Sequence, residues 1–484
     1  MTTSTTAEPT SILDPRLRWT TVGALSMVLL AAFEAMAVTT IMPAVSRDLD
    51  GAALYSVAFS ATLAASIVGM VVAGRWSDRS GPGAPLVTAV GTFFAGLLAA
   101  GLATSMETFI VGRFLQGLGG GALTVCLYVV VARLYPPALH PKVFGAFAAA
   151  WVIPSMVGPF VAGVVADQLS WHWVFLGVAA LVLLALASMA SALREILRAG
   201  AGGTVAEGAT DAPADEPVDA PADEPAPAPP AVRSGVAVLL ALVVAGGLIA
   251  LGTSAEVIEG HASWLMAAAA VAVVVVAVRP LLPRGTLLAR PGLPATILVR
   301  GTIAAAYFGT EVYLPLMLQR EYELSSSRAG LILTVGALSW ATGSNLQARL
   351  THVAPQRILT AGATMVLTGI TVQIATAAAD LGPWVAMAGW LVAGLGMGTS
   401  FPRITTLVLA YSTRAEQGAN SSALSISDAV GGASSTAIAG LVFGALAFVG
   451  GTQQFLGGFG VALVAALASV LVARRAGRPA RARP

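Results

Sequence analysis

Long apolar stretches separated by short polar loops dominate the chain. A helix needs about 20 mostly apolar residues to cross the hydrocarbon core of a bilayer. The pattern predicts fourteen membrane-spanning helices, near residues 19–45, 53–74, 84–104, 108–132, 143–166, 172–193, 234–253, 263–282, 295–319, 329–348, 357–378, 383–410, 419–447 and 455–473. The first stretch is too long for the apolar core of a cleaved signal peptide, so we expect it to be retained as a helix.

Basic residues are concentrated in every second loop of this predicted topology. If the N-terminus lies in the cytoplasm, most arginines and lysines fall in cytoplasmic loops, and the outer loops hold only Arg47, Arg320 and Arg328. Cytoplasmic loops of membrane proteins carry such an excess of Lys and Arg. We therefore predict a multi-pass protein of the cytoplasmic (inner) membrane with both termini in the cytoplasm.

Two sequence features recur in the two halves of the chain. TTIMPAV closes the first span at Pro43, and EVYLPLM closes the ninth span at Pro315, 272 positions later. The fourth span carries three alternating glycines in QGLGGG, and AGLGMG repeats their spacing in the twelfth span, 277 positions later. A duplicated six-helix unit explains both features. Transporters built from such repeats bind their substrate near the midplane, at the repeat interface.

One polar segment, residues 199–233, divides the spans. It contains DAPADEPVDAPADEPAPAPP, a composition that cannot bury apolar surface and favours a disordered or polyproline-like cytoplasmic linker. A solvated tether is the simpler interpretation, and a regulatory docking role is the alternative. We predict a six-helix bundle in 1–198, an inserted two-helix segment in 234–293, and a six-helix bundle with a basic cytoplasmic tail in 294–484.

The composition excludes several classes of protein. Hydrophobic residues make up 56% of the chain and charged residues 10%, whereas soluble domains carry about 25% charged residues. There is no nucleophile–base set and no phosphate loop, so we do not expect an enzyme. The lone cysteine, Cys126, and four scattered histidines have no ligand-like spacing, so we expect no metal site and no cofactor. We also expect no nucleic-acid partner.

Three acidic residues, Glu34, Glu311 and Asp428, lie inside predicted spans. A charged side chain at the bilayer centre costs roughly 2.5–3.5 kcal/mol on insertion scales. Such residues usually relay protons or ions, or neutralise a substrate charge. Glu311 has the alternative of facing an outer vestibule, and Asp428 that of joining a local polar network with Ser425 and Ser427.

The fourth span contains Arg113-x-x-Gln116-Gly117-x-Gly119. At 1.5 Å per residue, Arg113 lies about 8 Å inside the outer boundary, and Glu34 lies roughly 22 Å from the inner boundary of a core about 30 Å thick. An ion pair at this shared depth would offset the cost of both charges, and protonation of Glu34 would release Arg113. Snorkelling of Arg113 to the outer surface is the alternative. The glycines follow no strand, so they favour close helix packing over dinucleotide binding.

Two further motifs stand at helix ends and bends. The stretch GRWSDRSG at residues 74–81 closes the second span; its first glycine permits close helix approach, and its aspartate can cap a neighbouring helix. Ordinary anchoring by arginines is the alternative. The fifth span contains two prolines that should bend it and two glycines that permit close contact at the bend, namely Pro154, Gly158, Pro159 and Gly163. A generic kinked helix is the alternative there.

Together these motifs resemble the signatures of the major facilitator superfamily. Residues 74–81 resemble its loop signature G-x-x-x-D-R-x-G, and Arg113 matches an arginine implicated in proton coupling in its fourth-helix motif. The fifth span resembles the G-P-x-x-G-G motif of its antiporters, with Ala162 for one glycine. The spacing from Glu34 to Pro43 resembles the first-helix signature of the fourteen-span drug:proton antiporters, with glutamate in place of aspartate.

The resemblance implies an all-α integral membrane protein with the major facilitator fold. We expect two six-helix bundles related by pseudo-symmetry, plus an inserted pair of transmembrane helices. The implied function is proton-coupled antiport that exports small amphipathic compounds, cationic or neutral, by alternating access, as in multidrug efflux and antibiotic resistance. The same fold could instead export a lipid, a cell-envelope precursor or a dedicated metabolite. A non-transporting sensor would give the embedded acids no purpose.

Roles for single residues follow from the same resemblance. Glu34 is expected to be the main proton-coupling site, tuned by Arg113, with Glu311 and Asp428 available for a second proton or a substrate charge. The proton gradient would drive transport by a monomer surrounded by membrane lipids. The expected gating residues are Gly74, Asp78, Arg79 and Gly81. The candidates for stacking on a substrate, which have packing as their alternative role, are Phe33, Trp151, Tyr307 and Trp340.

Overall fold

The computed structural model describes residues 11–136, 139–189, 234–257, 261–350, 352–413, 416–446 and 451–476. Fourteen long helices and no strands are found in these residues, as predicted. The linker 199–233 and the tail beyond residue 476 lie outside the described residues. The helices are α1 (Arg18–Asp48), α2 (Tyr55–Ser80), α3 (Gly83–Gly101), α4 (Met106–Leu134), α5 (His140–Gln168), α6 (His172–Ser188), α8 (Ser234–Val257), α9 (His261–Val278), α10 (Leu293–Arg320), α11 (Ser326–Arg349), α12 (Pro355–Ala379), α13 (Pro383–Ala410), α14 (Gln417–Ala445) and α15 (Gln453–Ala476). Two 3-10 turns, η2 (Arg279–Leu281) and η3 (Thr286–Leu288), join α9 to α10.

The helices have the length and surface of membrane-spanning segments. Eleven of those in the described residues are long and apolar enough to cross a bilayer. Of the others, α6 is shorter, with 17 residues, and α10 carries Arg300 and Glu311. Many large apolar side chains point outward, among them Leu184, Leu265 and Val276. Because such side chains need an apolar solvent, this surface is the lipid-facing surface of a multi-pass membrane protein.

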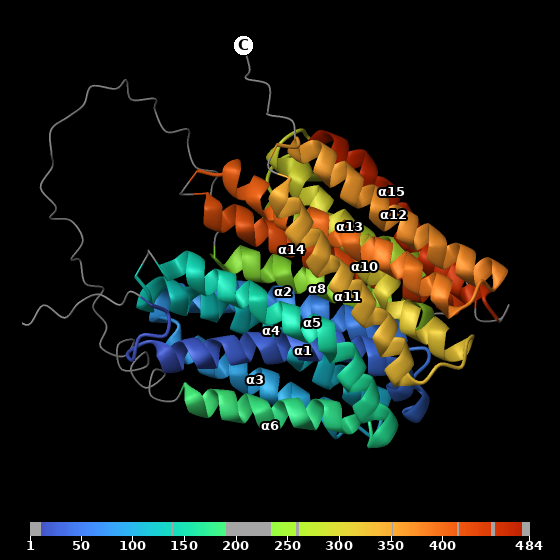
Figure 1. Cartoon of the computed structure of the whole chain (residues 1–484), viewed down its shortest axis with the longest axis horizontal. Helices are drawn as coiled ribbons and strands as arrows, with labels where there is room; N and C mark the ends of the chain where they lie inside the picture. The colour runs from blue at the N-terminus through green and yellow to red at the C-terminus, as the bar shows by residue number, and fades with distance from the viewer. Residues whose placement is uncertain are drawn as a thin grey trace, which may run out of the picture.

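The long helices form two bundles with the same internal packing. Figure 1 shows α1–α6, in blue to green, beside α10–α15, in yellow to red. In the first bundle α4 packs on α2 and α3, and α1 packs on α5 and α6. In the second bundle α13 packs on α11 and α12, and α10 packs on α14 and α15. Each helix pair therefore has a counterpart in the other bundle, which is the predicted pseudo-symmetry.

The alternating glycines explain how the central helix of each bundle packs so closely. A Cβ atom at Gly117 or Gly121 would lie 2.1 or 2.2 Å from a backbone oxygen of α2, and one at Gly119 would lie 2.4 Å from a backbone nitrogen of α3. The repeat has the same arrangement, since Gly394 and Gly398 face backbone oxygens of α11 and Gly396 faces one of α12. The interpretation of both glycine rows as helix-packing surfaces is confirmed.

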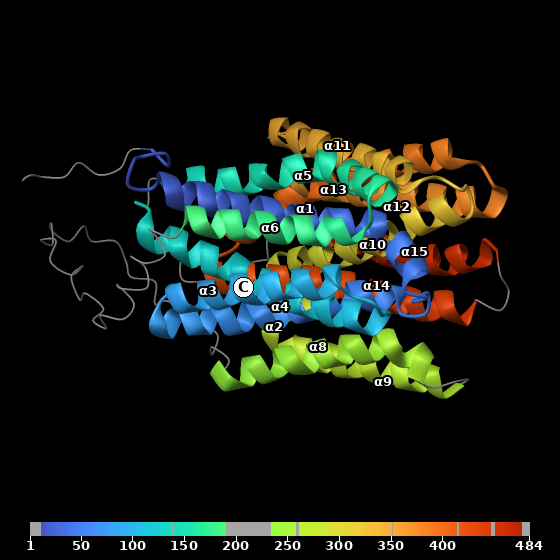
Figure 2. The same cartoon turned by 90° about the horizontal axis from the view of Figure 1, so that it is seen from below.

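The inserted pair lies outside the two bundles. Helices α8 and α9 pack on each other, and α8 also packs on α2 of the first bundle and α14 of the second. Figure 2 shows the pair along one side of the molecule. A Cβ atom at Gly252 of α8 would lie 3.0 Å from the Ser60 hydroxyl of α2 and 3.9 Å from Ala437 of α14. Helix α8 therefore covers the seam between the bundles.

Candidate functional site

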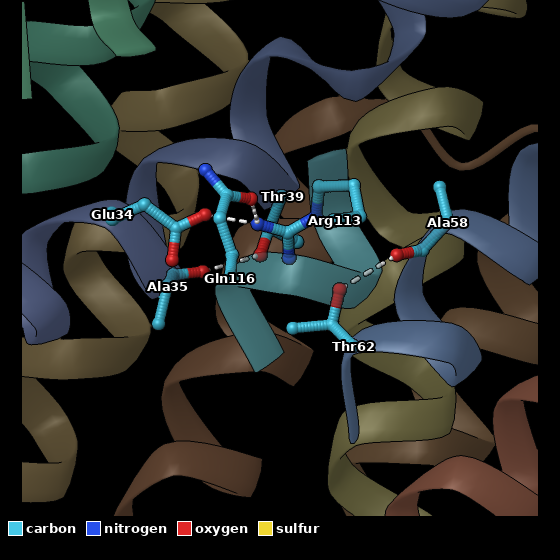
Figure 3. Close-up of polar contacts among 7 residues, drawn as sticks. All are labelled: Glu34, Ala35, Thr39, Ala58, Thr62, Arg113 and Gln116. Carbon is cyan, nitrogen blue, oxygen red and sulfur yellow. Dashed lines mark hydrogen bonds and ion pairs between the residues drawn. The ribbon is translucent and has the colours of Figure 1, made fainter. Parts of the chain in front are cut away.

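Glu34 of α1 and Arg113 of α4 form a buried ion pair between two helices of the first bundle (Figure 3). Each residue is only 4% exposed. One guanidinium nitrogen, Nη1, donates to Glu34 Oε1 and also to Gln116 Oε1, at 2.7 Å. Arg113 does not snorkel to the surface, so that alternative is wrong. The similar depth of the two residues on α1 and α4 is what allows them to meet.

The site around this ion pair is not saturated with hydrogen bonds. Arg113 Nε and Gln116 Nε2 are buried and have no hydrogen-bond partner among the described residues. Taking two charges out of water costs several kcal/mol per ion, which their mutual attraction repays only when the geometry is good. Loss of either charge would leave the other uncompensated in a low-dielectric environment. The pair is thus an arrangement whose energy depends strongly on the protonation of Glu34.

A second ion pair lies in the second bundle, between Arg300 of α10 and Asp428 of α14. Arg300 Nη2 donates to Asp428 Oδ2 at 3.0 Å, and the side chains are 16% and 25% exposed. The Arg300 guanidinium also lies over the ring of Phe401, 3.4 Å from its centroid. Asp428 Oδ1 and Arg300 Nε are buried without a hydrogen-bond partner in the part of the chain that the structure describes. This pair is more accessible than the pair in the first bundle.

The alternative role of Asp428 in a serine network is wrong. Ser427 Oγ donates to the carbonyl of Ile297 at 2.9 Å, and Ser425 Oγ donates to the carbonyl of Ser421 at 3.2 Å. Neither serine binds the carboxylate. Arg300, its actual partner, was missed by sequence reasoning, although a cation within ILVRGTIAAAY is a signal of the same kind as Arg113.

Glu311 is half-buried in α10 and has no hydrogen bond or ion pair with any other residue that the structure describes. One turn before it, Tyr307 stacks on Trp390 with 4.4 Å between ring centroids. Tyr307 also makes an edge contact with Trp340 at 5.4 Å, and Trp340 contacts Phe401 at 5.1 Å. Glu311 therefore stands beside an aromatic cluster that continues to Arg300.

The four predicted stacking residues do not form one group. Tyr307 and Trp340 belong to the aromatic cluster, to which sequence reasoning did not assign Trp390 and Phe401. Phe33 of α1 instead lies next to Gly158 of α5, where a Cβ atom would be 3.5 Å from its ring. Trp151 is on the exposed face of α5.

The predicted gating residues lie in the last two turns of α2, and Gly81 directly follows the helix. Asp78 is exposed near Arg75 and makes no hydrogen bond or ion pair within the described part of the chain, so the predicted helix cap is absent here. A Cβ at Gly74 would meet Val125 at an ordinary 3.6 Å, so the close helix approach expected there is also absent. Gly81 has a left-handed φ of 78°. This conformation ends α2, and Arg133 of α4 donates to the nearby Ser77 carbonyl at 3.2 Å.

The predicted close contact of α5 is present and joins the two bundles. A Cβ atom at Gly163 would lie 2.6 Å from the Ser326 carbonyl oxygen of α11. A Cβ at Gly330 of α11 would lie 2.3 Å from the Pro159 carbonyl oxygen. Pro154 and Pro159 both lie inside the helix. The α5 motif thus brings the first bundle against α11 of the second.

Sequence comparison identifies similar proteins. A sequence model of the Major Facilitator Superfamily matches residues 24–436. Multidrug transporter protein MdtP of Bacillus subtilis is 24% identical over 432 residues, which cover 87% of this chain and 74% of that one. A probable multidrug-efflux transporter of Mycobacterium tuberculosis is 25% identical over 83% of each chain. Multidrug resistance protein 3 of Bacillus subtilis is 29% identical, but the match spans only 33% of its length.

Solved structures resemble this chain in fold. A peptide transporter, POT, in complex with sulfate has a TM-score of 0.64 and 16% sequence identity, with 94% of each chain covered. A D-xylose-proton symporter has a TM-score of 0.61 and 16% identity, with 93% of this chain and 96% of that chain covered. Both likenesses extend over nearly the whole arrangement of helices.

Proposed function

The chain belongs to the Major Facilitator Superfamily, and from this premise we propose that it is a proton-coupled antiporter of small amphipathic compounds. Cationic or neutral compounds would leave the cell in exchange for protons, in the manner of the drug:proton branch. The names of two relatives matched over most of their length support a role in multidrug efflux. The observation that carries the proposal is the buried Glu34–Arg113 ion pair.

Proton coupling would begin at Glu34. In its ionised form the carboxylate neutralises Arg113, and the pair holds α1 against α4. A proton on Glu34 removes that charge attraction and leaves a buried positive charge with neutral acceptors such as Gln116 Oε1 beside it. Because an uncompensated buried charge is costly, the protonated site would favour a different arrangement of helices. Each elementary charge that crosses 100 mV contributes about 2.3 kcal/mol to this cycle.

The second bundle offers two further groups for substrate or proton. The Asp428–Arg300 pair is partly exposed, and one Asp428 oxygen has no partner within the described ranges. Glu311 has no cationic partner among the described residues and lies next to Tyr307. We propose that these acids and the aromatic cluster of Tyr307, Trp340, Trp390 and Phe401 contact the exported compound.

Alternating access would be controlled at the ends of the bundles. Asp78 and Arg79 are exposed in the last turn of α2. We propose that the Asp78 carboxylate is released in the conformation described here, and that it caps a helix of the other bundle when the cytoplasmic side closes. The transporter would act as a monomer in the cytoplasmic membrane, with both termini in the cytoplasm and without a cofactor.

Transport in proteoliposomes tests the proposal. Vesicles with an acidic lumen should accumulate cationic dyes, and an ionophore that collapses the pH gradient should abolish the accumulation. Glu34→Gln should abolish it as well, whereas Glu107→Gln, which removes an exposed acid of α4, should transport normally. Wild-type accumulation in Glu34→Gln would refute the role of Glu34. Folded wild-type protein that carries no dye would refute multidrug export.

A further inference from the structure

Hydrogen bonds between the two bundles gather at one end of the molecule. We call this the outer end, after the predicted topology; it contains the ends of α1, α5 and α10 at Asp48, Gln168 and Arg320. Five side-chain hydrogen bonds join the bundles there. For example, the Tyr55 hydroxyl donates to the Val312 carbonyl at 2.9 Å. In this structure the outer end is closed by direct polar contacts.

Asp167 contributes two of these five bonds. Its Oδ1 accepts from the backbone N–H of Ser326 at 3.2 Å, and its Oδ2 accepts from the backbone N–H of Ser327 at 2.9 Å. These residues begin α11, where the first N–H groups have no partner within the helix. Asp167 lies on α5, so a carboxylate of the first bundle caps a helix of the second.

The N-terminus of α11 is completed by both bundles. Ser325, the residue before the helix, accepts from the backbone N–H of Arg328 at 3.4 Å. Asp167 serves the first two N–H groups, which Ser325 does not reach. A negative charge at this position also interacts favourably with the positive end of the helix dipole. The start of α11 is therefore fully capped only while α5 is in contact with it.

The shape of the contact fits this cap. Pro159, Gly163 and Asp167 are spaced by four residues, so they share one face of α5. A Cβ atom at Gly163 or Gly330 would lie only 2.6 or 2.3 Å from a carbonyl oxygen of the facing helix, so the glycines leave the space that these oxygens need. Only because both positions lack a Cβ can α5 and α11 come close enough for the short aspartate side chain to reach backbone N–H groups. The glycine contact and the cap form one unit.

We propose that Asp167 is the latch of the outer gate. Its carboxylate binds the start of α11 when the outer end is closed and releases it when the bundles separate there. After release, water can bind both the Asp167 carboxylate and the N–H groups of α11. The contact therefore favours the closed outer end but does not prevent it from opening. The inference rests on the proposed alternating access, in which the outer end must open once in each cycle.

The test measures the opening of the outer end directly. Spin labels at Leu102 and Leu381, two exposed positions at the outer ends of the two bundles, report the separation by double electron–electron resonance. The background carries Cys126→Ala, because Cys126 is the chain's one cysteine. Asp167→Ala should increase the ratio of open to closed molecules about ten-fold, as expected from the loss of a helix cap. Asp167→Asn should give a smaller shift in the same direction, since its one amide oxygen can accept from only one of the two N–H groups.

Asp48 supplies a matched control. Its carboxylate lies at the same end and accepts from the Trp171 indole N–H at 2.9 Å, but Trp171 belongs to the same bundle. Asp48→Ala should leave the distance distribution unchanged. Equal distributions for Asp167→Ala and wild type, or equal shifts for Asp167→Ala and Asp48→Ala, would overturn the latch.

A second variant tests the other side of the contact. Ser326→Pro removes one of the two N–H donors, and proline is well accommodated at the first position of a helix. It should shift the distribution in the same direction as Asp167→Ala, but less. No shift in a folded Ser326→Pro protein would contradict the latch. The distances do not depend on transport, so a failure of drug export and a failure of the latch remain distinguishable.

Discussion

Trp390 occupies, in the second bundle, the position that Arg113 occupies in the first. Each residue lies four positions before the first glycine of its alternating glycine row. Arg113 neutralises Glu34, whereas Trp390 stacks on Tyr307 and its buried indole N–H has no partner among the residues that the structure describes. The repeat thus places a cation in one bundle and an aromatic ring in the other. This asymmetry fits the proposal that the first bundle binds the coupled proton and the second contacts the exported compound.

If Glu34 carries the coupled proton, its loss should abolish substrate uptake driven by a pH gradient but not substrate exchange at equal pH. Glu34→Gln keeps the side-chain shape and removes the titratable group, so substrate exchange at equal pH should persist. Uptake driven by a pH gradient should fall to background. Labelled dye can be followed in both assays with the same vesicles. Gradient-driven uptake that survives while exchange is unchanged would assign proton coupling to another residue.

Breaking the buried pair should cost more stability than removing it entirely. Arg113→Gln leaves Glu34 buried without its cation and should destabilise the protein by about 3–5 kcal/mol. The double variant Glu34→Gln with Arg113→Gln removes both charges and should lose less. The loss in the single variant should shrink as the pH falls, because protonation of Glu34 removes the uncompensated charge. Unfolding midpoints in detergent measure Arg113→Gln, Glu34→Gln and the double variant, and losses of the two single variants that simply add in the double variant would contradict the coupling.

Removal of one partner from the Arg300–Asp428 pair should destabilise the protein less than removal of one partner from the Glu34–Arg113 pair. Arg300 and Asp428 are partly exposed, so water can compensate a charge that loses its partner. Asp428→Asn should therefore cost about 1–2 kcal/mol, below the range for a fully buried pair. The same unfolding assay makes the comparison. A loss as large as that of Arg113→Gln would show that Asp428 is as isolated from water as Glu34.

The glycine rows predict a difference between neighbouring positions. Gly117→Ala would place a Cβ atom 2.1 Å from the Thr62 carbonyl oxygen, so α2 and α4 must separate, at about 1–3 kcal/mol. Gly120→Ala is the matched control on the same helix, because its nearest neighbours are atoms of the Phe93 ring at 3.8 Å. Gly120→Ala should be neutral or slightly stabilising, as alanine favours helix. Equal effects at both positions would refute the packing role.

Much of this architecture could be predicted from the sequence because its physical causes are local. Apolar length predicts the spans, and depth along two helices brought Glu34 together with Arg113. The partner of Asp428 was missed because serines nearby in sequence were considered and a cation on another helix, Arg300, was not. The contact of Asp167 with Ser326 joins segments whose meeting depends on how the bundles tilt. Periodicity within one helix carries no information on that tilt.

The position of α8 also limits how molecules can reach the interior from the bilayer. Gly252 lies against Ser60 of α2 and near Ala437 of α14, so α8 separates that junction from the surrounding acyl chains. The junction between α5 and α11 has no inserted helix in front of it in the described structure. Of the two junctions between the bundles, α8 therefore shields one from the acyl chains and leaves the other uncovered, so the two sides of the molecule differ in their exposure to the bilayer.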